Sequence, residues 1–126
     1  RPPRSTLFPS TTLFRSDDAA AAVRQTIELG ADWVVLTDGS RPTFIGFDGG
    51  LFRASPPEDL NVVNPIGCGD CLAAGIAVAL EGGRTPLDAI RFGMGAAIDN
   101  LGQLLPARLD RARVEAVARW ITPERI

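Results

Sequence analysis

The stretch that decides the fold is residues 64–77, NPIGCGDCLAAGIA, where a turn of small residues leads into an apolar segment. One carboxylate, Asp70, stands between the two. The apolar segment predicts a helix over about residues 70–80, and residues 60–63, LNVV, are typical of a brief strand before the turn. In a strand, glycine turn and helix of this kind, the first helical N–H groups and the positive end of the helix dipole face open space together. That geometry suits a phosphate or a developing oxyanion.

The rest of the chain supplies helix and strand signals on both sides of this stretch. The further predicted elements, in chain order, are a helix from Ser16 to Gly30, a buried strand over residues 33–37, a hairpin of residues 43–47 and 51–54, a helix opened by Thr85-Pro86, and a helix over about residues 110–120. This order predicts an α/β domain with its helices packed on a sheet. Because three or four strands make a narrow sheet, some apolar surface should lack a partner.

Length and composition set the class of protein. A chain of 126 residues makes one domain with a real core but rarely two. The net charge of −2 lacks the basic excess that favours nucleic acid or an anionic membrane, and no apolar run approaches the roughly 20 residues that span a bilayer. Two cysteines are too few for a disulfide scaffold, so we expect a reducing, cytoplasmic setting.

The residue types that are missing exclude several mechanisms. The chain has no His, no Lys and no Tyr, and all 13 of its basic residues are Arg. A histidine base, a phosphate-loop lysine and a Schiff-base lysine are therefore excluded within these residues. Proton transfer would depend on Asp, Glu or Cys.

Residues 1–16, RPPRSTLFPSTTLFRS, differ from the rest because they contain Arg, Ser and Thr but no acid, and because Thr-Leu-Phe occurs twice. They fit a transit-type segment or a disordered terminus, and they also resemble translated sequencing-adapter read-through. We expect a non-native or disordered leader over residues 1–16 and one functional unit over residues 17–126. The latter would then be the C-terminal part of a longer protein.

Asp70 has two interpretations. A carboxylate beside an anion site is useful for taking a proton from a nucleophile that attacks phosphorus. An acidic residue in a first helical turn also commonly just complements the helix dipole, which is worth about 0.3–1 kcal/mol. The residues alone leave both open.

The stretch NPIGCGDCLAAGIA resembles the C-terminal signature of the ribokinase-like (PfkB) carbohydrate kinases, with its Gly-Ala-Gly-Asp-type turn and a later Ala-Gly pair. ELGADWVVLTDGS and IRFGMGAAIDNLG resemble two further segments of that family in the family's order. The resemblance covers residues 17 to about 117. It implies the C-terminal, nucleotide-binding part of a ribokinase-like α/β/α sandwich, without the N-terminal half or more.

The resemblance implies roles for individual residues, with ATP and Mg²⁺ as cofactors. Asp70 would be the catalytic base that deprotonates the sugar hydroxyl. The remaining implied residues are an anion hole of Gly67, Cys68 and Gly69, and nucleotide contacts from Thr37, Gly39, Ser40, Gly69 and Asn100. No metal ligand is assigned within these residues, and the partners would be ATP and a small sugar or sugar phosphate, with no nucleic acid and no membrane.

Four residues at three sites depart from the family pattern. Cys68 replaces the usual Ala or Ser, and Pro42 stands where a second glycine is expected in the loop over the nucleotide. Asn64-Pro65 replaces a common Asp-Thr, which weakens any claim for a monovalent-cation site. The Asn-Pro pair is similar to the subgroup that phosphorylates sugar phosphates, namely 1-phosphofructokinase and tagatose-6-phosphate kinase.

Two other functions remain in view. Cys68 and Cys71 form a C-x-x-C at a predicted helix start, the placement found in thiol-disulfide oxidoreductases. The chain could also be a non-catalytic nucleotide-binding fragment, since most sugar contacts would belong to the missing part. We expect the isolated chain to be inactive as a kinase and the full-length protein to be an enzyme, with a homodimer as one arrangement of it.

Overall fold

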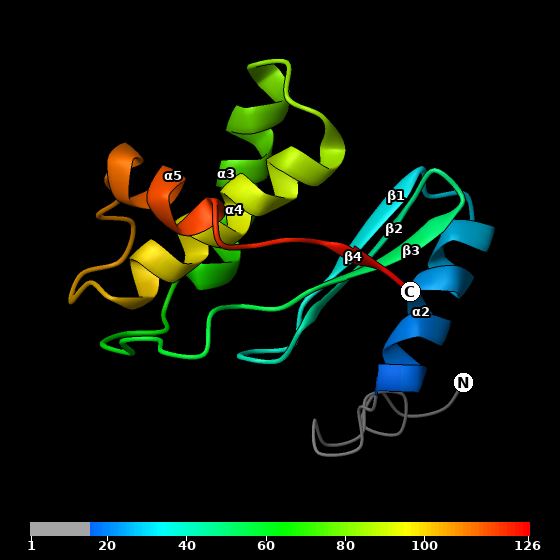
Figure 1. The fold of residues 1–126 in the computed structure, drawn as a ribbon, viewed down its shortest axis with the longest axis horizontal. Coiled ribbons are helices and arrows are strands. Elements are labelled where there is room, and N and C mark those ends of the chain that lie inside the picture. The colour runs from blue at the N-terminus through cyan, green and yellow to red at the C-terminus, as the bar shows by residue number, and fades with distance from the viewer. Residues whose placement is uncertain (1–15) are drawn as a thin grey trace, which may run out of the picture.

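The computed structural model describes residues 16–126, which form a four-stranded sheet with helices on both faces (Figure 1). Helix α2 (Ser16–Glu28) precedes the strands β1 (Trp33–Leu36), β2 (Thr43–Phe47) and β3 (Gly50–Ala54). Three helices and a short strand follow: α3 (Cys68–Glu81), α4 (Pro86–Leu101), α5 (Arg111–Ala118) and β4 (Glu124–Arg125). The predicted α/β class is confirmed.

The strands lie in the order β1-β2-β3-β4, and each neighbouring pair is antiparallel. Side chains alternate between the two faces, as the pleat requires. On one face Val34, Leu36 and Phe44 pack on α2. On the other, Val35 and Ile45 pack with residues of α3 and α4. The sheet is therefore the middle of three layers.

The helix boundaries follow local signals in the sequence. Thr85 caps α4 by accepting a hydrogen bond from the Asp88 N–H, with Pro86 at the first helical position. Asp110 caps α5 in the same way through the Arg113 N–H. Gly30, beyond α2, has a φ of 108°, a conformation that glycine adopts without strain.

Two strand predictions need correction, and one strand was not predicted. Residues 60–63 are not a strand, because the N–H groups of Val63 and Asn64 bond to the Leu101 carbonyl at the end of α4 and not to a strand neighbour. Strand β1 is half-buried along its length, since in the described residues it pairs on one side only. Strand β4 was missed, because a strand of two exposed residues has no hydrophobic pattern.

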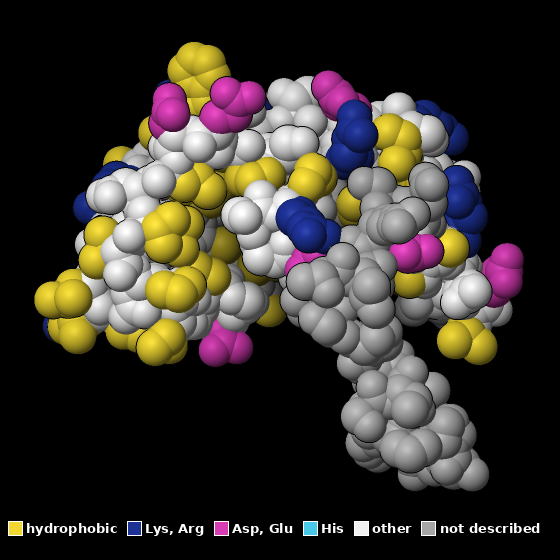
Figure 2. Space-filling model, turned by 90° about the horizontal axis from the view of Figure 1, so that it is seen from below, with side chains coloured by type: hydrophobic (Ala, Val, Ile, Leu, Met, Phe, Trp, Pro, Cys, Tyr) yellow, Lys and Arg dark blue, Asp and Glu magenta, His cyan; other side chains and the backbone are white. Residues whose placement is uncertain are grey.

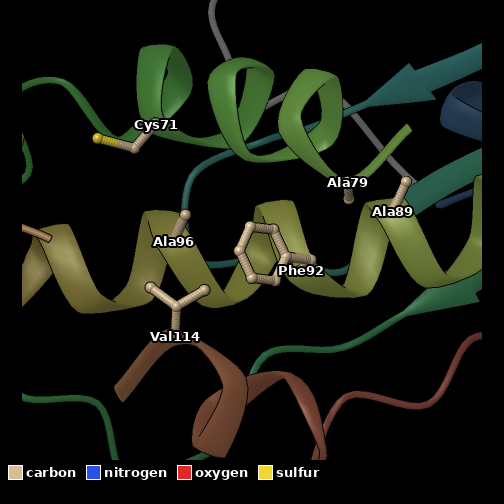
Figure 3. Packing of buried hydrophobic residues seen from close by; sticks show 6 residues of the cluster. All are labelled: Cys71, Ala79, Ala89, Phe92, Ala96 and Val114. Carbon is tan, nitrogen blue, oxygen red and sulfur yellow. The ribbon is translucent and has the colours of Figure 1, made fainter. Parts of the chain in front are cut away.

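Helices α3 and α4 pack closely because small residues meet at their crossing. In Figure 3 Cys71 and Ala79 of α3 face α4, and Val114 of α5 points at α4 near Ala96. The buried cluster consists of Cys71, Ala79, Ala89, Phe92, Ala96 and Val114. This packing fixes the start of α3 relative to the sheet, which is where the candidate site lies.

Candidate active site

A cleft of about 470 Å³ lies where the loop after β1 meets the start of α3. Polar residues enter it from the loop between β1 and β2, and apolar side chains enter it from α3, α4 and residues 56–65. Its lining consists of Thr37, Gly39, Ser40, Arg41, Thr43, Pro56, Leu60, Val62, Pro65, Cys68, Gly69, Leu72, Met94, Ala97, Ile98 and Leu101. The fold thus brings together two segments that are about thirty residues apart in sequence.

The loop after β1 contributes the three nucleotide-binding residues predicted there. Thr37, Gly39 and Ser40 all line the cleft. The loop turns tightly, because the Arg41 N–H donates to the Asp38 carbonyl at 3.0 Å and Gly39 has a φ of 53°. The side chains of Arg41 and Asp38 also form an ion pair at 3.5 Å. A polar rim is therefore held on the sheet side of the cleft.

The glycine turn before α3 is fixed by local hydrogen bonds. Asn64 Oδ1 accepts from the Ile66 N–H at 3.0 Å, and the Cys68 N–H donates to the Pro65 carbonyl at 3.3 Å. Gly67 has a φ of 85°, in the left-handed region that glycine favours. The turn therefore needs glycine at position 67 for its backbone conformation.

The N-terminus of α3 leaves two donors uncommitted. No side chain caps the helix. The Cys68 N–H is engaged by Pro65, whereas the N–H groups of Gly69 and Asp70 have no hydrogen-bond partner among residues 16–126. A Cβ built at Gly69 would meet no atom within 4 Å, so the backbone beside the cleft is open to a ligand. Of the three residues of the predicted anion hole, Gly69 thus offers an unpaired N–H and also lines the cleft, and Asp70 offers a further N–H at the next position.

Asp70 lies in the first turn of α3 and is exposed. It follows Gly69 directly, and no hydrogen bond or ion pair engages its carboxylate within the described part of the chain. The residues that line the cleft reach Cys68 and Gly69 but do not include Asp70. Its carboxylate is therefore accessible at the margin of the cleft.

Asn100, predicted to contact the nucleotide, is fully buried and does not line the cleft. Its amide nitrogen donates to the Ile66 carbonyl at 2.9 Å and to Cys68 Sγ at 3.3 Å. Its oxygen accepts from the Ala107 N–H at 2.7 Å. The structure places this side chain behind the glycine turn.

The two cysteines lie in different surroundings. Cys68 is half-buried, and its thiol donates to the Ala97 carbonyl at 3.4 Å. Cys71 is buried in the α3–α4 interface, and burial raises the pKa of its thiol above the usual value, with the neighbouring Cys68 adding to the shift. In a C-x-x-C redox pair the first cysteine is the attacking thiol, and here Cys68 is committed to the Ala97 carbonyl, which weighs against the oxidoreductase hypothesis.

Sequence reasoning missed several cleft residues. Arg41 and Thr43 stand at the polar rim, and Met94 and Ile98 present the face of α4. Arg41 could have been found, because it is a cation in the same loop as Thr37 and Gly39. The α4 residues could not, because only the folded chain shows which face of a buried helix meets a cleft.

Exposed apolar side chains gather beside the cleft. Residues 62–66 and 101–107 lie side by side, since Asn64 Nδ2 donates to the Leu104 carbonyl at 2.9 Å. Figure 2 shows hydrophobic side chains concentrated over the end of the molecule that carries these loops. The exposed apolar residues of the two segments are Val62, Val63, Ile66, Leu104 and Leu105. The narrow sheet was expected to leave apolar surface without a partner; the exposed apolar residues found here belong to two loops and not to the sheet.

An uncapped helix N-terminus at a glycine turn beside a cleft has the geometry of an anion-binding site. Residues 7–103 match the model of the pfkB family carbohydrate kinases, and the chain belongs to that family. The matched range overlaps the leader predicted over residues 1–16. That leader lies outside the described residues except for Ser16.

Similarity to individual proteins supports the same family. The chain is 37% identical over 71 residues to a 1-phosphofructokinase of Borreliella burgdorferi, a match that covers 56% of this chain and 23% of that protein. Among solved structures, phosphofructokinase-2 of Escherichia coli in complex with potassium aligns with a TM-score of 0.76 at 17% identity, covering 86% of this chain and 35% of the other. Ribokinase of Thermotoga maritima aligns with a TM-score of 0.69 at 22% identity, covering 82% and 40%. The chain thus spans well under half the length of these relatives.

Two features are absent from residues 16–126. None of the helices described there is long and apolar enough to cross a membrane. No group of three or more His, Cys, Asp or Glu side chains stands ready to hold a metal ion in this part of the chain.

Proposed function

We propose that this chain is the nucleotide-binding part of an ATP-dependent kinase that phosphorylates a hydroxyl of a sugar or sugar phosphate, such as fructose 1-phosphate or tagatose 6-phosphate. One observation supports this most directly. The cleft joins Thr37, Gly39 and Ser40 to the open backbone at Gly69, with the exposed carboxylate of Asp70 at the next position. Membership of the pfkB family agrees with this arrangement.

The residues present fit the phosphates of ATP. The N–H groups of Gly69 and Asp70 are unpaired within residues 16–126, and the dipole of α3 favours negative charge at this end. Arg41 adds a positive side chain to the lining. Mg²⁺ would neutralise charge on the phosphates, and the described residues offer no acidic cluster of their own for it.

Asp70 is the proposed general base. As the sugar oxygen forms its bond to the γ-phosphorus and the bond to the β-phosphate oxygen breaks, the hydroxyl proton would pass to the Asp70 carboxylate. The N–H groups at the start of α3 would hold the oxygens of the transferred group. The Asp70 carboxylate is exposed, and no hydrogen bond or ion pair within the described residues occupies the oxygens that would take the proton.

The wider setting of the protein is also a proposal. We place it in the cytoplasm, where its free Cys68 and Cys71 would stay reduced. Its partners would be ATP and the sugar, and the full-length protein could form a homodimer; a tetrameric inhibited form is known for phosphofructokinase-2 of Escherichia coli. The isolated 126-residue chain would bind nucleotide without catalysing transfer.

Replacing the proposed base separates catalysis from binding. In the longer protein expected to contain this chain, Asp70→Asn should lower kcat by about 10²–10⁴-fold, the usual contribution of a general base. Nucleotide affinity should stay within about threefold of wild type or tighten, because one negative charge beside the phosphates is removed. Coupled-assay kinetics and calorimetry would measure the two effects. A variant that retains more than about a tenth of wild-type kcat would contradict the role of Asp70 as base.

A further inference from the structure

We infer that Asn100 is a positioning residue that holds the glycine turn in its anion-binding shape, acting through Ile66 and Cys68, and not a ligand of the nucleotide. This inference rests on the proposed function, since the turn matters only if it binds phosphate. Asn100 has no exposed surface. Its effect on the cleft must therefore pass through the groups that it contacts.

The contacts of Asn100 reach both sides of the glycine turn. Asn100 Nδ2 donates to the carbonyl oxygen of Ile66, before Gly67, at 2.9 Å and to Sγ of Cys68, after Gly67, at 3.3 Å. Gly67, between them, is the residue with a φ of 85°. A single side chain thus fixes the two residues that flank the left-handed position.

The third contact of Asn100 stabilises the loop after α4. Ala107 has a φ of 60°, which is costly for a residue with a Cβ, and its N–H donates to Asn100 Oδ1 at 2.7 Å. The neighbouring Pro106 backs the turn, because a Cβ at Gly67 would lie 3.4 Å from Pro106 Cβ. Asn100 therefore connects the turn to the loop that packs behind it.

The side chain of Cys68 also takes part in this arrangement through two hydrogen bonds of its sulfur. Its sulfur accepts from Asn100 and its thiol donates to the Ala97 carbonyl at 3.4 Å, so it links two positions of α4 to the first residue of α3. An alanine at position 68 could make neither contact. Asn100 and Cys68 are consequently expected to act as a pair, with effects that are not additive.

The neighbouring Asp99 provides a matched control. It is also buried and also stands near the end of α4, but it contacts α5: Asp99 Oδ1 accepts from Arg113 Nε at 2.6 Å, and Asp99 Oδ2 accepts from the Asp110 N–H at 2.9 Å. Replacing Asp99 loosens the α4–α5 contact without removing a contact to the glycine turn. It therefore reports the effect of general destabilisation.

The test compares Asn100→Ala, Cys68→Ala, the double variant and Asp99→Asn in the 126-residue chain. Calorimetry measures the affinity for Mg²⁺ with a non-hydrolysable ATP analogue, and NMR measures the amide resonances of Gly69 and Asp70 without ligand. We expect Asn100→Ala to weaken nucleotide affinity about tenfold and Cys68→Ala to weaken it less. The loss of affinity in the double variant should be smaller than the product of the two single losses. Asn100→Ala and Cys68→Ala should each shift the amide resonances of Gly69 and Asp70. Asp99→Asn should neither weaken nucleotide affinity nor shift these resonances.

The other possible results of these measurements would overturn the positioning role of Asn100 or test it in a second way. Unchanged affinity and unmoved resonances in Asn100→Ala would overturn it, and so would an equal loss of affinity in Asp99→Asn. If Asn100→Ala does not fold, Cys68→Ala decides by the same two measurements. If the wild-type chain binds no nucleotide, the proposed kinase function fails in this chain, while the Gly69 and Asp70 resonances still show whether Asn100 holds the turn.

Discussion

The contact between α3 and α4 and the contact between α2 and the sheet both involve glycine, but for different reasons. At the helix crossing, a Cβ at Gly93 would lie 2.7 Å from the Leu72 carbonyl oxygen, and one at Gly75 would lie 2.8 Å from the Cα of Gly93. The obstacle there is mostly backbone. On the sheet, a Cβ at Gly46 would lie 2.6 Å from Cγ1 of Val23 and 3.2 Å from Cγ1 of Ile27, which are side-chain atoms.

The difference shows which part of the molecule can adapt. Side chains can change rotamer to admit a methyl group, whereas two helix backbones must separate. Because α3 begins at the glycine turn and α4 ends behind it, separating the two helices would also displace the cleft. The rigid contact is therefore the one on which the site depends.

Gly93→Ala should have the largest effect on stability. Its Cβ would clash with the Leu72 carbonyl and with Ile76, so we expect the free energy of unfolding to fall by about 3 kcal/mol, at the upper end for an overpacked core. Denaturant unfolding followed by circular dichroism would measure it. Gly82→Ala, beyond the far end of α3 with only ordinary contacts at 3.5 Å, is the control and should change stability by less than about 0.5 kcal/mol. Equal values for the two variants would refute the backbone contact at the crossing.

Gly46→Ala should cost less, about 1 kcal/mol, because Val23 and Ile27 can shift and alanine suits a strand better than glycine. The same unfolding measurement applies. Nucleotide affinity should be unchanged, since Gly46 faces α2 and not the cleft. A loss as large as that of Gly93→Ala would show that the sheet layer is as rigid as the helix crossing.

The Arg84–Glu115 ion pair should give the smallest effect and a pH dependence. Arg84, before α4, bonds to Glu115 on α5 and lies 4.6 Å from the ring centroid of Phe92. The hydrogen bond from Arg84 lowers the pKa of Glu115 below its usual 4.5. A lowered pKa means that the folded state binds fewer protons, so the contribution is present above pH 4.5 and is lost as the pH falls through the folded pKa.

Glu115→Gln tests this directly. At pH 7 the variant should be less stable by about 0.2–1 kcal/mol, the range for partly exposed pairs. The difference should shrink toward zero as the pH falls through the lowered folded pKa of Glu115, below which this residue is protonated in both states. Unfolding curves at several pH values would measure it. A difference that stays constant with pH would show that the charge of Glu115 contributes nothing.

Much of this arrangement could be predicted from the sequence. Caps and turn residues such as Thr85 and Asp110 mark helix ends, and alternating apolar residues mark the hairpin, because these signals are local. The resemblance of residues 64–77 to a family signature predicted a site there, and the cleft is lined by Pro65, Cys68 and Gly69 of this stretch. Thr37 and Gly39 were expected near Gly69, and they line one cleft with it.

The remainder depended on contacts between distant segments. Residues 60–63 have strand-like side chains, yet the adjacent N–H groups bond to the end of α4, and no local pattern encodes that choice. Asn100 looks like a polar residue available for a ligand, but the fold buries it behind the turn. Packing decides which side of a helix holds the partner of a polar side chain. Helix α4 has few charged residues that would indicate its exposed side.

The most direct test of the central claim, that the cleft at the start of α3 binds nucleotide phosphates, is calorimetric titration of Mg²⁺ and a non-hydrolysable ATP analogue into the chain and its Gly69→Leu variant. A side chain at Gly69 enters open space beside the cleft, so the variant should fold as well as wild type and lose at least about tenfold in affinity. Gly82→Leu, past the other end of α3, should bind as wild type does. A folded wild-type chain that binds no nucleotide, or a Gly69→Leu variant that binds equally well, would contradict the claim.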